Sequence, residues 1–240
     1  MFPYDPSLVA AAQTPVESIA DVLHVMRIIE GLCDDGDGLK WFNWLYLQVT
    51  EAVAARVASA GFSDPGWIAD LDVRFAKLYF GALRSALAGQ PGPGCWQTLF
   101  GCRHWTTIAR IQFALAGINA HINHDLPEAI VSTYRGSAAA PVHDSPHYHD
   151  YTALNTTLDS LVESAKRTLS VRLLGEPLPA VSHLEDMIAA WSVSAAREAA
   201  WQNAEVLWHL QTVPPLSSNF MDALDGLTTV VGKALLVPVP

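Results

Sequence analysis

Helix signals recur along the whole chain, and this regularity limits the possible folds more than any other feature of the sequence. Apolar residues return at spacings of three and four, whereas Val, Ile and Thr never gather into the alternating runs typical of strands. Helix-starting patterns stand at Thr14–Glu17, at Asp64–Pro65 and at Ser182–Glu185. The sequence therefore predicts an all-α fold.

The length and the loop signals predict one domain. A chain of 240 residues, half of them hydrophobic, can build one sizeable core and does not require a second. Residues 89–95 and 135–149 are rich in Gly, Pro, Ala and Ser and are predicted to be loops. Between them a long helix is expected from about Arg103 to Asp125, where Pro127 breaks or restarts it. We expect residues 1–240 to form a single-domain multi-helix bundle around this central long helix.

Charge and cysteine content narrow the possible partners. The net charge is −10 and only 16% of the residues are charged, which disfavours nucleic acid and anionic membrane surfaces as partners. No basic leader precedes an apolar run, and no apolar stretch approaches the roughly 20 residues of a membrane span. The cysteines Cys33, Cys95 and Cys102 are odd in number and well separated, which argues against a disulfide framework. We expect a cytoplasmic protein; its oligomeric state cannot be inferred from the sequence.

The polar stretch NAHINHD, residues 119–125, stands out inside an otherwise apolar helix. His121 and Asp125 are one turn apart, so that the carboxylate can orient the imidazole and raise its basicity. Ala114 and Gly117 continue this stripe with small side chains, which allows another backbone or a ligand to approach closely. The stretch is therefore the likeliest functional centre, with His121 and Asp125 as candidate catalytic residues.

Structural roles compete with this interpretation. Asp125–Glu128 fits a capping box for a new helix, and His121 alone fits a buried core histidine whose hydrogen bonds are satisfied. Asn119 and Asn123 are poor helix formers, so their amides are expected to bond to something other than solvent; both are candidate substrate-binding residues.

A second candidate group lies on the helix that follows Asp64. Asp72, Phe75 and Tyr79 share a helix face, which places a carboxylate on an apolar surface. A buried carboxylate needs a partner or a raised pKa. Arg197, one turn before Trp201, is the candidate partner, so a buried structural ion pair is the competing interpretation. Asp72 is a candidate catalytic residue, and Tyr79, Arg197 and Trp201 are candidate substrate-binding residues.

Two further groups are weaker candidates. Asp21 and His24 share a line on the first helix and could add ligands or acid groups to a central site, although a solvated face explains them equally. His143, His147 and His149 fall in the predicted second loop, where exposure or a lid is expected rather than a metal site.

Five segments together resemble a bacterial family catalogued as domain of unknown function 5995. The segments are DGLKWFNWLYLQVTEAV (37–53), LDVRFAKLY (71–79), AGINAHINHDLP (116–127), HDYTALN (149–155) and AREAAWQNAEVLW (196–208). The most specific element is the pattern Asn-Ala-His-Ile-Asn-x-Asp-Leu, which residues 119–126 match. His124 falls at its variable position and ranks below His121 and Asp125. The resemblance supports the fold and the site but implies no reaction.

We expect an enzyme that performs acid–base chemistry without a cofactor on a small apolar metabolite. Eight tryptophans and the low charge suit an apolar cavity between helices, with a few convergent polar groups. Cyclisation, dehydration or isomerisation in secondary metabolism would fit, for example a spiroketal-type ring closure.

Two other functions stay open on the sequence alone. One is a metal-dependent hydrolase, with a divalent ion such as zinc, manganese or iron at His121 and Asp125 and further ligands from Asp21, His24 or Asp72. The other is a non-catalytic small-molecule binder or a structural helical protein, in which the polar stretch only fixes helix register.

Overall fold

The computed structural model describes residues 2–169 and 186–238, and within them every regular element is helical and no strand occurs. The first half contains α1 (Asp5–Ala12), α2 (Ile19–Leu32), α3 (Gly38–Ala58), α4 (Pro65–Leu87), α5 (Gly94–Cys102) and α6 (Arg110–Ala120). The second half contains the π-helical turn η1 (His121–Asp125), α7 (Leu126–Tyr134), α8 (Pro146–Thr152), α9 (Asn155–Leu169), α11 (Val193–Leu210) and α12 (Pro214–Leu235). The all-α prediction is confirmed.

The helix starts follow local capping chemistry. Asp64 begins α4 as predicted, because its carboxylate accepts the Trp67 N–H at 2.9 Å. The predicted start at Thr14 is wrong: the Thr14 N–H bonds back to the Ala11 carbonyl at the end of α1. Instead, α2 begins after Ser18, which exchanges cap hydrogen bonds with Asp21. The predicted start at Ser182–Glu185 lies outside the described residues.

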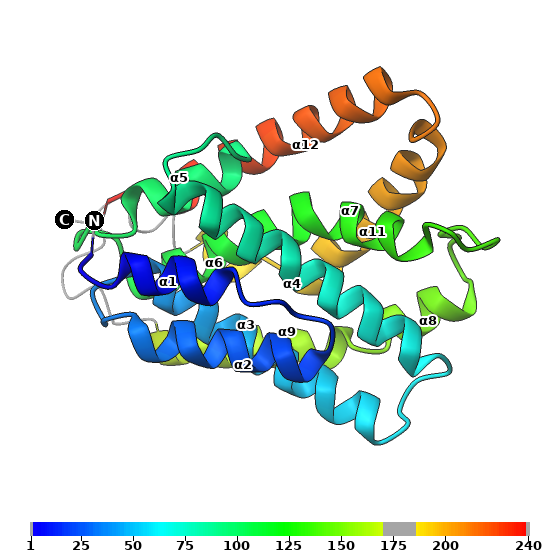
Figure 1. Ribbon diagram of the computed structural model, residues 1–240, viewed down its shortest axis with the longest axis horizontal. Helices are drawn as coiled ribbons and strands as arrows, with labels where there is room; N and C mark the ends of the chain where they lie inside the picture. The colour runs from blue at the N-terminus through cyan, green and yellow to red at the C-terminus, as the bar shows by residue number, and fades with distance from the viewer. Residues whose placement is uncertain (1, 170–185, 239–240) are drawn as a thin grey trace.

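The central helix is shorter than predicted at its beginning and continues past its expected end. It begins at Arg110, and the polypeptide then runs through η1 directly into α7. Pro127 does not break it, because a wider turn accommodates the missing N–H: the Leu126 N–H donates to the His121 carbonyl, five residues earlier. Residues 111–120 are all buried. Figure 1 shows α6 in the middle of the molecule, among helices from both halves of the chain.

The predicted loops are shorter than expected, because a helix takes part of each. The first loop ends before Gly94, where α5 begins; the N–H groups of Gly94 and Cys95 donate to Asp225 of α12 at 2.7 and 2.9 Å. The second ends at Ser145, whose hydroxyl accepts the Tyr148 N–H and begins α8. Sequence analysis missed α5, since its cap comes from a residue 130 positions away.

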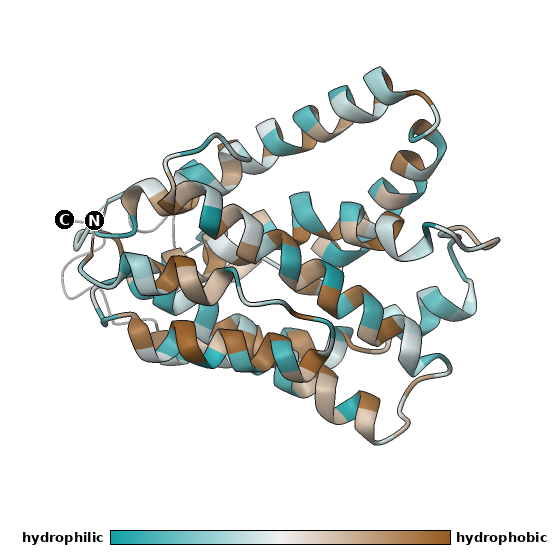
Figure 2. Cartoon of the chain, viewed as in Figure 1, coloured by the Kyte–Doolittle hydropathy of each residue, from teal (hydrophilic) through white to brown (hydrophobic). Residues whose placement is uncertain are grey.

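The close approach expected at Gly117 is made by another helix. A Cβ atom on Gly117 would lie 2.4 Å from the ring of Phe42, so α3 and α6 meet at this glycine. The space is therefore filled by a protein side chain, and no ligand approaches at this position. Phe42 belongs to one continuous core of buried hydrophobic residues. Figure 2 shows the hydrophobic and hydrophilic residues mixed along each helix, as amphipathic helices require.

A buried ion cluster fixes the N-terminal segment to the bundle. Arg103 is 4% exposed; its Nε donates to Asp37 at 2.8 Å and its Nη2 lies 3.1 Å from Asp5. The sequence predicts Arg103 at the start of the central helix; in the structure it follows the end of α5 and links α1 to the start of α3.

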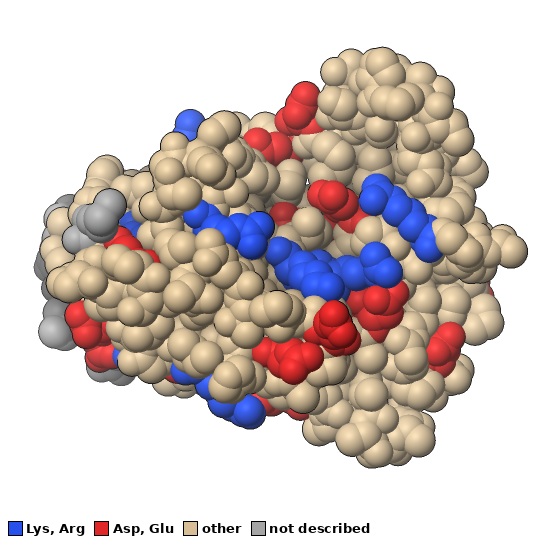
Figure 3. All heavy atoms as spheres, viewed as in Figure 1, with Lys and Arg blue, Asp and Glu red and all other residues tan. Residues whose placement is uncertain are grey.

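The molecular surface carries few charges. Figure 3 shows one face, on which acidic and basic side chains lie close together across the middle while most of the remaining surface is uncharged. Within the described part of the chain, no helix is both long enough and apolar enough to cross a membrane.

Candidate functional site

Asp125 is the centre of a buried hydrogen-bond network. Its Oδ2 lies 2.9 Å from Nδ1 of His121 and accepts the indole N–H of Trp96, also at 2.9 Å. Its Oδ1 lies 2.7 Å from Nδ1 of His124. The interpretation of Asp125 as a helix cap is therefore wrong, because its side chain accepts no N–H from the first turn of α7.

The network determines where the protons lie. Burial opposes ionisation of Asp125, but the hydrogen bonds from His121 and His124 outweigh it, and the pKa of the carboxyl lies below its usual value. Burial also holds the pKa of His121 below its usual value, despite the nearby carboxylate. We therefore assign a neutral His121 whose Nδ1–H donates to Asp125, which leaves a lone pair on Nε2. For His124, burial lowers the pKa, but the hydrogen bond to Asp125 and the nearby negative charges together outweigh burial, so the pKa lies above its usual value.

The free nitrogen of His121 lies in an aromatic enclosure. Its Nε2 is buried and has no hydrogen-bond partner among the described residues. The imidazole stacks in parallel on Phe75, with ring centroids 3.4 Å apart, and Tyr46 meets it edge-on at 4.5 Å. These contacts fix the plane of the ring, and Nε2 is a base without a protein partner among the described residues.

An apolar cavity with two lobes, which share five lining residues, adjoins the His121 side chain. Both lobes are small: the space open to water-sized molecules is about 50 Å³ in one and about 30 Å³ in the second, so a larger ligand must push their walls apart. Both lobes are lined by Tyr46, Val49, Phe75, Leu158 and Arg197. The larger lobe adds Val53, Ile68, Leu71, Asp72, Leu126, Tyr151 and Leu154, and the smaller adds Ile118, His121, Ile122, Val162 and Val193.

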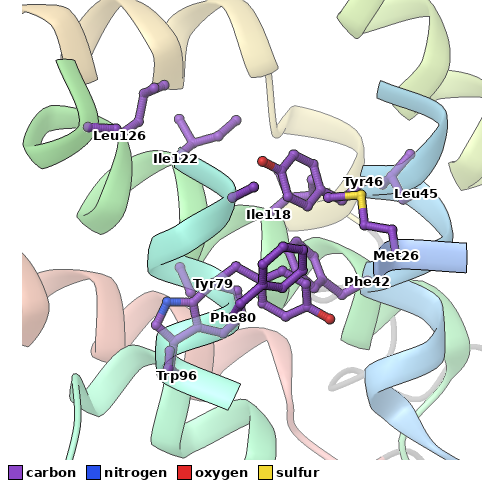
Figure 4. Packing of buried hydrophobic residues seen from close by; sticks show 14 of the residues in the cluster. Met26, Phe42, Leu45, Tyr46, Tyr79, Phe80, Trp96, Ile118, Ile122 and Leu126 are labelled. Atoms are coloured by element: carbon purple, nitrogen blue, oxygen red, sulfur yellow. The ribbon is translucent and has the colours of Figure 1, made fainter. Parts of the chain in front are cut away.

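Tyr46 lines both lobes. Figure 4 shows its ring beside Ile118, with the hydroxyl on the side of Ile122. The hydroxyl is buried without a partner in the described residues. Burial raises the pKa of Tyr46 well above its usual value, and the nearby charges of Asp72 and Asp125 raise it further. Sequence analysis missed Tyr46, because its helical spacing from Phe42 resembled ordinary core.

Asp72 brings a third unpaired polar group to the cavity. It is 8% exposed, and its Oδ2 has no partner in the described chain. Burial raises its pKa to about 7, so a large part of this carboxyl is protonated near neutral pH. The predicted ion pair between Asp72 and Arg197 is wrong. Both side chains line the larger lobe, but Arg197 donates instead to the side chain of Asn155 and to the carbonyl of Tyr151.

The remaining candidate binding residues lie outside the cavity walls. Asn119 donates to the Thr228 carbonyl and Asn123 donates to Asn119, both at 3.0 Å, so the expectation of bonded amides is confirmed. Tyr79 donates to the side chain of Asn43 and Trp201 donates to that of Glu205. None of these four predicted residues lines either lobe.

The weaker candidates do not join the site either. Asp21 uses its carboxylate in the cap of α2, and His24 is exposed. His147 is in helix α8 rather than a loop, and it lies between the Tyr134 hydroxyl and Asp64. Within residues 2–169 and 186–238, no group of three or more His, Cys, Asp or Glu side chains is placed to hold a metal ion.

The other two histidines of the predicted second loop lie near the molecular surface. His143 is exposed and its Nε2 lies 3.4 Å from Glu198 of α11, while His149 is an exposed residue of α8.

The fold and the site define an α-helical protein that holds a buried histidine–aspartate pair beside an apolar cavity. The chain belongs to the family of unknown function DUF5995, whose model matches residues 19–238. Comparisons with curated proteins and with solved structures give no match.

Proposed function

We propose that this protein is an enzyme that performs acid–base chemistry, without a cofactor, on a small apolar compound in the cavity. The observation that carries the proposal is the His121 imidazole. Its Nδ1 is fixed by Asp125, whereas its Nε2 is buried beside a cavity and unpaired among the described residues. A histidine oriented by a carboxylate, with its second nitrogen free, is the arrangement that general-base catalysis uses.

Asp72 supplies the complementary acid. Its carboxyl is protonated to a large extent near neutral pH, because burial raises its pKa to about 7. Asp72 and Phe75 are one turn apart on α4, and Phe75 stacks on His121, so acid and base lie at neighbouring parts of one cavity. A proton donor (Asp72) and a proton acceptor (His121) in one apolar site favour concerted proton transfer.

A dehydrative ring closure illustrates the chemistry. Nε2 of His121 takes the proton of an attacking hydroxyl, the new C–O bond forms, and Asp72 protonates the departing hydroxyl, which leaves as water. The imidazolium then returns a proton to the Asp72 carboxylate, directly or through water. Isomerisations need the same pair of groups. The apolar walls favour a hydrophobic metabolite, and we place the reaction in secondary metabolism.

The test uses a panel of apolar hydroxy ketones and enones, incubated with the full chain. Product formation and deuterium uptake from solvent are followed by mass spectrometry. We expect His121→Gln, which keeps a planar polar side chain but has no basic nitrogen, to lower the rate about 10²- to 10⁴-fold. The matched control is His24→Gln, because His24 is exposed and lines neither lobe.

Thermal unfolding of each variant separates catalysis from folding. Equal rates for the wild type and a folded His121→Gln variant would contradict the proposal. Tight binding of panel compounds without any turnover would instead favour a non-catalytic binding protein.

A further inference from the structure

Arg197 of α11 is a buried cation in the wall of both lobes. Its side chain is held by neutral groups only: Nε donates to Asn155 Oδ1 at 2.8 Å and Nη2 donates to the Tyr151 carbonyl at 2.7 Å. The guanidinium carbon also lies 3.8 Å from the centroid of the Tyr151 ring. These contacts fix the guanidinium plane without neutralising its charge.

The charge of Arg197 has no carboxylate partner in the described residues. Arg103 is comparably buried, at 4% exposed against 7%, but it pairs with both Asp5 and Asp37. Arg197 forms no such ion pair with a described residue. The negative charge of Asp159 acts on Arg197 from a distance, but the Asp159 carboxylate accepts a hydrogen bond from the Ser194 N–H. A buried cation without a counter-ion lowers the stability of the fold, because no opposite charge offsets the free energy lost on desolvation. The missing charge is therefore expected from a bound molecule.

We infer that the ligand of this cavity carries a carboxylate that pairs with Arg197, while its apolar body lies along the surrounding aliphatic and aromatic walls. The inference rests on the proposed function in taking this cavity as the substrate site. It deepens that proposal by defining the substrate class, an apolar carboxylic acid.

The lining favours a carboxylate over a phosphate. Arg197 is the only Lys or Arg among the described residues that line the two lobes. A single guanidinium balances one negative charge and matches the planar geometry of a carboxylate. A phosphate monoester, with nearly two charges near neutral pH, would keep an uncompensated charge in an apolar site.

The position of Arg197 also gives the substrate a direction. Arg197 lines both lobes, Asp72 lines one and His121 the other. A carboxylate held at Arg197 fixes one end of the substrate, so that every bound molecule has the same orientation relative to Asp72 and His121. Arg197 is accordingly a substrate-binding residue, and its loss should raise KM more than it lowers kcat.

The test measures binding by isothermal titration calorimetry with the full chain. The probes are hexanoate, octanoate and decanoate, each compared with the alcohol of the same chain length, at about pH 6, where Asp72 is mainly neutral and the probes are ionised. We expect the best carboxylate to bind at least about tenfold more tightly than its alcohol. Arg197→Gln should abolish this preference, and Arg197→Lys should keep part of it, because the charge remains without the planar fork.

The control is Arg84→Gln, since Arg84 is exposed and lies outside the cavity lining. If Arg197→Gln does not fold, Arg197→Lys serves as the test: a weaker preference for carboxylate over alcohol than in wild type supports the inference, and an unchanged preference overturns it. Equal affinity of wild type for carboxylate and alcohol, or absence of binding, overturns the inference. His121→Gln should keep the preference, so a wild type that prefers carboxylates but needs no His121 for turnover contradicts the acid–base proposal alone.

Discussion

The Trp96 indole donates to the same oxygen of Asp125 that binds His121. Both contacts measure 2.9 Å, and Trp96 is almost fully buried on α5. The indole has a donor but no acceptor, so Oδ2 of Asp125 must be the acceptor, and a donated hydrogen bond favours the ionised form of the carboxyl. The orientation of His121 thus depends on α5 as well as on its own helix.

Asp125→Asn should change the tautomer of His121. The wild-type carboxylate accepts the Nδ1 proton, whereas a carboxamide can present either a donor or an acceptor to that nitrogen. We expect ¹⁵N NMR of the imidazole to show the Nδ1–H form in wild type and a substantial Nε2–H population in the variant. Turnover of any active substrate should fall about 10²- to 10⁴-fold. An unchanged His121 tautomer in a folded variant would contradict the role assigned to Asp125.

Asp72→Asn should alter the dependence of stability on pH. Burial raises the pKa of Asp72 to about 7, so the folded protein holds a proton there that the unfolded chain releases above about pH 4. The unfolding free energy of wild type therefore falls as pH rises from about 4 to about 7, and Asp72 accounts for up to about 4 kcal/mol of this loss. Relative to wild type, the variant should gain stability between about pH 5 and pH 8, measured by urea unfolding.

Asp70→Asn is the control for that experiment. Asp70 lies on the same helix, and its side chain is 45% exposed beside Arg74. We expect its unfolding free energy to follow that of wild type across the same pH range. A parallel shift in both variants would show that Asp72 has no special environment.

Gly117→Ala should destabilise the fold. The added Cβ would lie 2.4 Å from the Phe42 ring, which is itself packed inside the core, so the α3–α6 contact would have to open. Overpacking of this kind costs about 1–3 kcal/mol. Gly81→Ala on α4 is the control: its Cβ would meet nothing within 4 Å, and we expect a gain of about 0.5–1 kcal/mol. Chemical denaturation of both variants distinguishes the two cases.

Asp37→Asn should cost about 3–5 kcal/mol of unfolding free energy, because it leaves the buried Arg103 with one carboxylate partner fewer. Asp35→Asn, two residues earlier, removes an exposed carboxylate that pairs with Lys40 and Arg110, and should cost no more than about 1 kcal/mol. Similar losses in the two variants would contradict the importance of burial at Asp37.

Local sequence signals predicted most of the longer helices and the His121–Asp125 contact, because these features depend on residues within one turn of one another. The start of α4 at Asp64 and the pairing of His121 with Asp125 both follow from spacing alone. The π-helical turn was not predictable in this way, since Pro127 signals a break whether or not the preceding turn can widen.

Contacts between distant segments could not be read from the sequence. Arg197 was expected to meet Asp72, but the geometry brings it to Asn155 and Tyr151 instead. Tyr46 resembled a core residue, and only the packing of α3 against η1 and α4 shows that its hydroxyl is left without a partner. Spacing places a side chain on a helix face but does not identify the neighbouring helix.

The hydrogen bonds that α12 makes to the middle of the chain have a consequence for synthesis on the ribosome. Asp225 completes the first turn of α5, and the Thr228 carbonyl satisfies the buried Asn119. Both partners are translated more than a hundred residues later than the groups they satisfy. The first turn of α5 and the buried amide of Asn119 therefore stay without these partners until α12 has been synthesised and has packed against them, so these contacts form late in folding.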